Sequence, residues 1–355
     1  MPIVADTYNV LVGVDTHAAA HTFAVIDAAT GALLANSEFP TSQAGLRRAL
    51  AWVTRRVEDR SCLVIIDGAG SYGAILTGQL DANGYALAEA PDIPAHVRRK
   101  GGKTDSLDAA EIARATRGLD DTQLRRPRSG GDRAALRILT TARDQMTSER
   151  TRAVNALTAL LRLNDLGIDA RRSLSHKKIV TIAAWRTPRA AMTTTQAVSR
   201  AEAIRLARRI RALDSDLTDN RAALTAAVTA QAPELLKVRG VGPVVAATVL
   251  HAWSHPGRIH SEAAFAALAG VAPLPASSGN TRRHRLNRGG DRRLNRALYT
   301  VALTRLGHDP RTRDYLTRRT AEGATRREII RILKRYISRE LFRLLTTTQA
   351  ATITT

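Results

Sequence analysis

VLVGVD, at residues 10–15, is a run of apolar residues that ends in a carboxylate. A short apolar run of this kind predicts a buried strand, with Asp15 at its carboxyl end. A second run, CLVII at residues 62–66, leads in the same way to Asp67. The sequence therefore predicts two buried strands, and each of them brings an acidic side chain to its end.

Two more acidic residues stand in KTDSLDA, at residues 103–109, where a helical pattern begins. Asp105 and Asp108 are three residues apart, so they share one helix face, with Cβ atoms about 5–6 Å apart. Four carboxylates that converge from two strand ends and a helix repel one another unless divalent cations hold them. Asp15, Asp67, Asp105 and Asp108 therefore predict a Mg²⁺ or Mn²⁺ site that serves phosphoryl chemistry.

Each of these acidic residues alone has a simpler explanation. A strand-end Asp is often a turn residue or a helix cap, and an Asp-x-x-Asp pair is often a solvated helix face. The combined placement of the four residues, together with the excess of basic residues, favours the metal site. His17, His21 and His96 lack the spacing of metal ligands, and we expect them at the surface or supporting the ligands.

The order of the predicted elements indicates the fold of the first part of the chain. The elements are strands at 8–15, 21–27 and 32–39, a helix capped within 41–44, a strand at 62–66, a helix through 75–80 and a strand at 85–89. Three antiparallel strands, a helix, and then alternating strand and helix is the order of a ribonuclease-H-like (RuvC-like) α/β domain. We place this domain at residues 1–130.

From residue 131 the pattern becomes almost purely helical. Apolar residues at a spacing of three and four, interrupted by Arg143, Arg150 and Asn220, predict two long helices within residues 131–230. An antiparallel hairpin or coiled coil fits this pattern, and ordinary amphipathic helices in one bundle fit it nearly as well. Residues 165–200, between the two helices, have no pattern that predicts a structure.

Residues 231–355 form a third predicted unit, which is mostly α-helical. Gly240 and Gly242 precede a helix at 244–250, so free backbone N–H groups there could hold a phosphate, as in a helix–hairpin–helix element. A plain packing corner between two helices is an equal alternative. Helices are expected to continue to about residue 345, and the threonine-rich end is expected to fray.

A Ser-Gly turn at Ser278 precedes a stretch with six arginines and one aspartate, residues 281–293. A serine that attacks a phosphodiester needs cations around the developing negative charge, and arginine supplies them. A serine before a glycine is also common in ordinary turns. The predicted nucleic-acid-binding residues are Lys103, Gly240, Gly242, Arg282, Arg283, Arg285, Arg288, Arg292 and Arg293.

The chain of 355 residues has 54 basic and 32 acidic residues, a net charge of +22, which indicates a polyanionic partner. A GC-rich genome would enrich arginine, but it does not explain the shortage of acidic residues. The single cysteine, Cys62, excludes a disulfide framework and a cysteine-based zinc site within one chain. No apolar run approaches the ~20 residues of a membrane span, so we expect a cytoplasmic protein.

Seven short motifs together resemble the DEDD-type transposases of insertion sequences, the IS110 family. They are VGVD at 12–15, IIDGAGSY at 65–72, KTDSLDA at 103–109, GVG at 240–242, ALAGVAP at 267–273, SG at 278–279 and RGGD at 288–291. The motifs cover nearly the whole chain in the order of that family. One departure is that the family usually has Glu, in a Glu-x-Thr-Gly-x-Tyr setting, where this chain has Asp67, and that Ala69 replaces the Thr.

The resemblance implies a RuvC-like domain, a coiled-coil insertion and a C-terminal transposase domain with a catalytic serine. It places the catalytic carboxylates on Asp15, Asp67, Asp105 and Asp108, and the serine on Ser278. It also implies DNA as substrate, a noncoding bridge RNA as guide, and a homo-oligomer, either a dimer or a tetramer.

Several functions are compatible with the residues themselves. The first is a DNA transposase or recombinase, and the second is a RuvC-like structure-selective endonuclease without serine chemistry. A ribonuclease-H-like sugar kinase or ATPase is disfavoured by the missing Gly-rich phosphate loops and by the positive charge. A DNA-binding protein that has lost catalysis through the change at Asp67 is the last alternative.

Overall fold

The computed structural model describes residues 2–91, 105–128, 131–186, 192–255, 257–275, 284–285, 287 and 289–353. The chain forms two compact units. The first comprises Met1–Gly130 and Ser254–His260, and the second comprises Gly131–Trp253 and Ser261–Thr355. Within the described residues, no helix is both long and apolar enough to cross a membrane.

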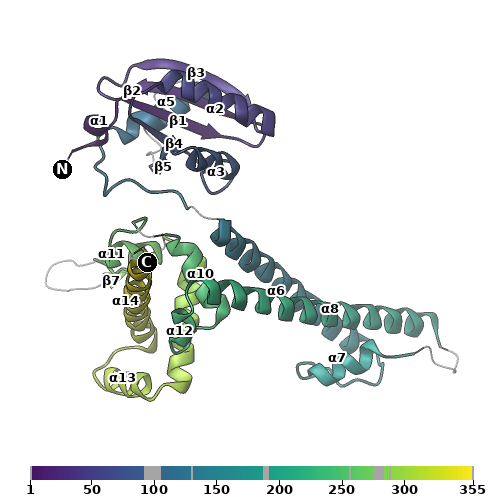
Figure 1. Ribbon diagram of the computed structural model, residues 1–355. Helices are drawn as coiled ribbons and strands as arrows, with labels where there is room; N and C mark the ends of the chain where they lie inside the picture. Colours follow the sequence, from purple (N-terminus) through teal and green to yellow (C-terminus); the bar gives the residue numbers. More distant parts are fainter. Residues whose placement is uncertain are drawn as a thin grey trace. The chain divides into compact units, whose positions relative to one another are not determined.

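The first unit contains a mixed sheet. Its five strands, among the residues described, lie in the order β3-β2-β1-β4-β5 (Figure 1). Their bounds are β1 Val10–Thr16, β2 Ala20–Asp27, β3 Leu33–Pro40, β4 Cys62–Ile66 and β5 Ala86–Glu89. The pairs β1–β2 and β2–β3 are antiparallel, and the pairs β1–β4 and β4–β5 are parallel. The predicted strands are confirmed, and the two strands that end in carboxylates are neighbours at the centre of the sheet.

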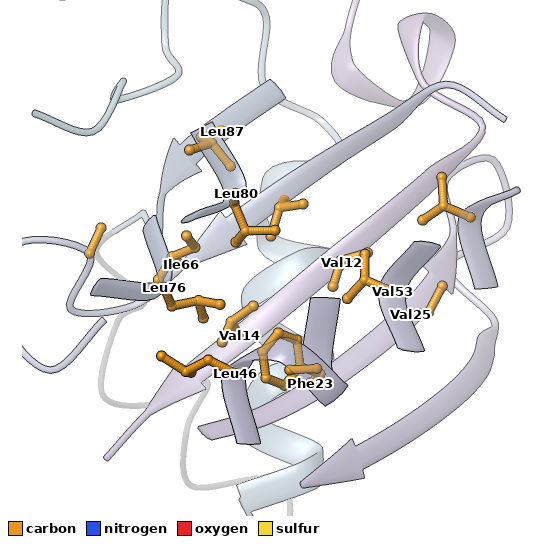
Figure 2. Packing of buried hydrophobic residues seen from close by; sticks show 14 of the residues in the cluster. Val12, Val14, Phe23, Val25, Leu46, Val53, Ile66, Leu76, Leu80 and Leu87 are labelled. Carbon is orange, nitrogen blue, oxygen red and sulfur yellow. The ribbon is translucent and has the colours of Figure 1, made fainter. Parts of the chain in front are cut away.

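Side chains of β1 alternate between the two faces of the sheet, as a strand requires. Val10, Val12 and Val14 lie in one apolar cluster, shown in Figure 2, with residues of α2 (Gln43–Val57) and α3 (Ala74–Ala82). Leu11 lies in a second cluster with residues of α5 (Asp105–Thr116) and with Val4 of α1 (Val4–Thr7). Both faces of β1 are therefore buried, which explains why VLVGV is apolar throughout.

The predicted helix start within residues 41–44 is also confirmed. Ser42 is the N-cap of α2, and its hydroxyl accepts a hydrogen bond from the backbone N–H of Gly45. The side chain thereby satisfies one of the free N–H groups that every helix start exposes. This cap fixes where the chain turns from the edge strand β3 onto the face of the sheet.

The second unit begins with a helical hairpin. The long helices α6 (Gly131–Leu163) and α8 (Thr194–Gln231) pack against each other, and α7 (His176–Ala183) packs on α8 (Figure 1). The helices are antiparallel, because hydrogen bonds join Asn220 Nδ2 to the Leu139 carbonyl and Arg143 Nη1 to the Leu217 carbonyl, at 3.0 and 2.9 Å. The predicted antiparallel pairing is therefore confirmed.

The polar residues that interrupt the apolar pattern of the hairpin pair with one another. Arg143 donates to the side-chain carbonyl of Asn220 at 3.3 Å, and Arg150 forms an ion pair with Asp214. Asn220 is buried, so its amide would be costly without these partners. Such buried polar pairs fix the register of the two helices in a way that apolar contacts alone do not.

The rest of the second unit is mostly helical. Its elements are α9 Glu234–Lys237, α10 Pro243–Trp253, α11 Glu262–Leu268, β6 Leu274–Pro275, β7 His284–Arg285, α12 Arg292–His308, α13 Pro310–Ala321 and α14 Arg326–Ile353. The short strands β6 and β7 pair antiparallel. The apolar α10 packs against α6, α8 and α12.

The last helix extends beyond its expected end near residue 345, because α14 continues to Ile353. The hydroxyl groups of Thr346 and Thr347 donate to the carbonyls of Phe342 and Arg343, at 3.0 and 2.9 Å. A threonine hydroxyl that bonds the carbonyl one turn earlier is satisfied inside a helix, so threonine does not have to end it.

Candidate active site

Two of the predicted carboxylates lie at the ends of neighbouring parallel strands. Asp15 belongs to β1, and Asp67 follows β4 directly. The backbone N–H of Asp67 donates to the Val14 carbonyl at 2.9 Å, so the parallel ladder continues through Asp67. By alternation from Leu11 on β1 and Ile65 on β4, both carboxylates belong to the face of the sheet that α5 covers. Asp15 is only 9% exposed, whereas Asp67 is exposed.

Gly13 explains how the third carboxylate approaches this edge. A Cβ atom at Gly13 would overlap the carbonyl oxygen of Ala109, so the backbone of α5 lies directly against β1. Ala109 and Ala113, both fully buried, form the face of α5 at this contact. Glycine on the strand and alanine on the helix allow the close approach. Asp108, one residue before Ala109, is thereby carried toward the end of β1.

Asp15 experiences the charges of both other carboxylates. Burial is the main cause that raises the pKa of Asp15, and the negative charges of Asp67 and Asp108 raise it further. His17 opposes this rise, because its Nε2 lies 3.1 Å from Asp15 Oδ2. Three of the four predicted carboxylates therefore share one electrostatic environment, in which the buried member bears its charge unfavourably.

Thr16 joins the two strand ends, and the sequence analysis did not identify it. Its hydroxyl, in a residue that is 8% exposed, donates to the backbone carbonyl of Asp67 at 2.7 Å. The next residue, Gly68, has a φ of +66°, and a Cβ there would lie 2.7 Å from Thr16 Oγ1. The available signal was local: a hydroxyl residue follows Asp15, and a glycine follows Asp67.

The histidines near this edge differ in their surroundings. His17 is exposed, as expected, apart from its contact with Asp15. His21 is buried on β2, opposite Thr16, so it lies in the core rather than at the surface, and burial lowers its pKa. His96 lies outside the described residues.

Several predicted site residues lie wholly or partly outside the described residues. Asp105 begins α5, but its side chain lies outside the described part of the structure. Lys103, Ser278, Arg282, Arg283 and Arg288 lie outside the described residues, and of Arg285 the structure describes only the backbone, in β7.

We call Asp15, Asp67 and Asp108 together the carboxylate edge, and their chemistry fits a hard divalent cation. Asp15, Asp67 and Asp108 offer only oxygen donors, the kind that Mg²⁺ and Mn²⁺ prefer, and a cation would relieve their mutual repulsion. As these side chains stand, the described residues contain no group of three or more His, Cys, Asp or Glu side chains that could hold a metal ion. A cation would therefore have to draw the three carboxylates together, with Asp105 as a further donor.

The two predicted phosphate-binding glycines have different surroundings. Gly240, with a φ of +82°, packs against α12, and a Cβ there would lie 3.3 Å from Val301. This position fits the packing-corner alternative. Gly242 immediately precedes α10, and a Cβ there would have no heavy atom within 4 Å. Only Gly242 thus leaves room for a phosphate at the helix start.

The last two predicted arginines lie at the start of α12. Asp291 caps this helix by accepting from the backbone N–H groups of Arg293 and Leu294. Arg293 ties α12 to α6, because it donates to Thr141 at 2.8 Å and pairs with Asp144 at 3.3 Å. Arg292 is exposed. Arg293 therefore already has an intramolecular role.

Comparisons with known proteins match both ends of the chain. Residues 12–164 match a family described as a transposase, of the DEDD type found in IS110 elements, and residues 232–317 match the transposase IS116/IS110/IS902 family. A 42 kDa protein of insertion element IS900 from Mycobacterium paratuberculosis is 30% identical, over 91% of this chain and 92% of that protein. A 43.6 kDa protein of insertion element IS110 from Streptomyces coelicolor is 27% identical, over 87% of each chain.

Proposed function

Because this chain belongs to the IS110 family of insertion-sequence transposases, we propose that Asp15, Asp67, Asp105 and Asp108 hold divalent cations for its reaction on DNA. The enzyme is a DNA transposase, which cleaves and rejoins phosphodiester bonds. The observation that carries the proposal is the position of Asp15 and Asp67 at the ends of two neighbouring parallel strands, on the sheet face that α5 covers. When bound, Mg²⁺ or Mn²⁺ would stabilise the charge that develops on a phosphoryl oxygen.

We assign a ribonuclease-H-like, RuvC-like fold to residues 1–130. The sheet order β3-β2-β1-β4-β5, with three antiparallel strands followed by two parallel ones, supports this assignment. The position of Asp15 and Asp67 at the ends of the two central strands supports it further. Residues 131–230 would serve as a coiled-coil region, and residues 231–355 as the transposase domain with a helix–hairpin–helix-like element.

We assign the nucleophile to Ser278. In this step the Ser278 oxygen forms a bond to phosphorus, the bond from phosphorus to one DNA strand breaks, and the released strand end takes up a proton. Arg282, Arg283 and Arg285 would stabilise the extra negative charge of the transition state. The support is the Ser-Gly motif of the family and the six arginines within residues 281–293. The serine and the carboxylates are far apart in sequence, so folding or the pairing of protomers in a dimer or tetramer must bring them together.

A noncoding RNA guide is the remaining part of the proposal. Two observations support it. The net charge of +22 favours polyanionic partners, and the resemblance of the chain to the IS110 family implies such a guide. Lys103, Gly242, Arg288 and Arg292 are the residues that we assign to nucleic-acid contact besides the arginines near Ser278. Protein purified at low salt should carry RNA of a discrete length.

The experiment that tests the proposal combines two variants with one assay of DNA cleavage. Asp105→Asn should retain DNA binding and lose Mg²⁺-dependent cleavage, and EDTA should have the same effect on the parent protein. Ser278→Ala should retain binding and lose the covalent protein–DNA product, whereas Ser277→Ala should keep it.

Undiminished cleavage by Asp105→Asn, or in EDTA, would overturn the metal assignment. Cleavage without any covalent product would indicate the alternative, a RuvC-like endonuclease without serine chemistry. A Ser277→Ala variant that fails while Ser278→Ala recombines would move the nucleophile to Ser277.

A further inference from the structure

Five arginines recur at every fourth position along α14. They are Arg327, Arg331, Arg335, Arg339 and Arg343. A spacing of four places each side chain next to the following one on the helix surface, and like charges at this spacing destabilise a helix. An ordinary solvated face places acidic residues four positions from basic ones. This arginine stripe has no acidic residue within it and therefore requires negative charge from elsewhere.

A carboxylate of the protein supplies that charge at the centre of the arginine stripe. Glu262 of α11 forms ion pairs with Arg335 and with Arg339, the second at 3.0 Å. One carboxylate thus serves two half-buried arginines. Burial, and then the charge of Arg339, lower the pKa of Arg335, which shows how closely the positive charges are placed.

The N-terminal part of the arginine stripe has no such partner. Arg327 and Arg331 are exposed, and neither forms an ion pair with any residue that the structure describes. Arg326, beside them in the first turn, is also exposed. Glu328, the nearest acid in sequence, accepts from the backbone N–H and the hydroxyl of Thr325, and its charge also interacts with that of Arg331. Three positive charges therefore lie on two turns of helix against one negative charge.

The preceding helix α13 and the start of α14 are arranged like a known DNA-binding motif. Four residues, 322–325, connect α13 to α14, and Gly323 among them has a φ of +86°. Tyr315 of α13 and Tyr336 of α14 pack edge to face, with ring centroids 6.3 Å apart, and α12 packs against both helices (Figure 1). Two helices joined by a short turn with glycine, braced by a third helix, resemble a helix–turn–helix, in which the second helix enters a DNA groove.

We propose that the α13–α14 corner is a duplex-DNA contact, in which Arg326, Arg327 and Arg331 at the start of α14 bind backbone phosphates. On the preceding helix, the arginines in the last turn, Arg318 and Arg319, already pair with Glu322. DNA is the substrate of the enzyme, and the first turns of a second helix are the part that approaches a duplex in helix–turn–helix proteins. This contact uses none of the residues that we assign to catalysis, so its test does not depend on the proposed catalytic residues.

The test measures binding of full-length protein to duplex DNA at several salt concentrations. The Arg327→Ala, Arg331→Ala double variant should reduce the slope of log affinity against log salt by about 2, because each lost phosphate contact removes about 0.9. Alanine favours helices, so α14 should persist, and circular dichroism checks this. The Arg327→Lys, Arg331→Lys variant should restore most of the slope.

The matched control removes two exposed arginines from α2 of the first unit, in the Arg48→Ala, Arg55→Ala variant. It changes the net charge equally and should leave the slope of the parent protein. An unchanged slope in the α14 variant, or an equal loss in the α2 control, would overturn the proposal. A loss confined to RNA, with duplex-DNA binding intact, would overturn it as well.

Discussion

The carboxylate edge of the first unit and the ion pairs of the second unit differ in whether their charges are balanced by opposite charges. In the second unit two sets of half-buried side chains pair with opposite charges: Arg150 pairs with Asp214, and Glu262 pairs with Arg335 and Arg339. In the first unit the buried Asp15 has two carboxylates as neighbours and only His17 to oppose them. Charges that are paired within the fold offset one another's cost of burial, and charges that are left unpaired are candidates for binding a cation or a polyanion.

The comparison is tested most strongly by a substitution at each kind of charge. Asp67→Asn should reduce DNA cleavage by a factor on the order of 10³, since a cation ligand that stabilises the transition state is lost. Asp67→Glu should keep most of the activity, because it restores the family's usual residue. Glu149→Gln, which removes an ion pair with Arg209 in the hairpin, should leave cleavage unchanged. Equal losses in Asp67→Asn and Glu149→Gln would break the comparison.

A smaller effect is expected at Thr16, which carries no charge but positions Asp67 relative to Asp15. Thr16→Val keeps the shape of the side chain and removes the hydrogen bond to the Asp67 carbonyl. The Mn²⁺ affinity of the full-length protein should fall about 10- to 100-fold, as it does when a group that orients a metal ligand is lost. Thr16→Ser keeps the hydroxyl and should bind Mn²⁺ as the parent does. Weak binding in Thr16→Ser too would reduce Thr16 to a packing role.

In the hairpin we expect a loss of stability and no loss of catalysis. Asn220→Ala removes the hydrogen bonds that Asn220 makes with the Leu139 carbonyl and with Arg143, which keeps its bond to the Leu217 carbonyl, and should cost about 1–3 kcal/mol of unfolding free energy. Urea unfolding measures the cost, and cleavage per folded molecule should stay that of the parent. A loss of cleavage at full stability would show that the polar residues of the hairpin act in the reaction.

The smallest effect is a gain in stability at Asp15. The pKa of Asp15 is raised in the folded protein, so its ionised form opposes folding at pH values above that pKa. Without metal, Asp15→Asn should therefore unfold at a higher temperature than the parent at pH 7. The difference should shrink as the pH falls below the raised pKa toward the ordinary value of 3.8. Added Mn²⁺ should stabilise the parent and not the variant.

Much of the first unit could be predicted from the sequence, because its signals are local. Apolar runs predicted the strands, and the end of each run predicted the positions of Asp15 and Asp67 at the strand ends. The roles of Gly13 and Thr16 depend on contacts with Ala109 and with Asp67, which lie far away in sequence, so local patterns indicate these roles only weakly. The glycine within an apolar strand was nevertheless a signal of close backbone approach.

The second unit was harder to predict in detail. The sequence showed polar interruptions at Arg143 and Asn220, but it could not show that they bond to each other across 77 residues. The arginine stripe of α14 is visible as a spacing of four. Only the structure shows which of these arginines are paired: Glu262 pairs with Arg335 and Arg339, while Arg327 and Arg331 are exposed.

The most direct test of the central claim is a titration of Mn²⁺ into the metal-free, full-length protein, followed by the loss of the electron paramagnetic resonance signal of free Mn²⁺. We expect saturable binding of one or two ions, lost in Asp15→Asn and in Asp108→Asn and unchanged in Glu149→Gln. Absence of saturable binding, or binding that survives both Asp substitutions, would contradict the claim that the unmatched carboxylates of the first unit form a cation site.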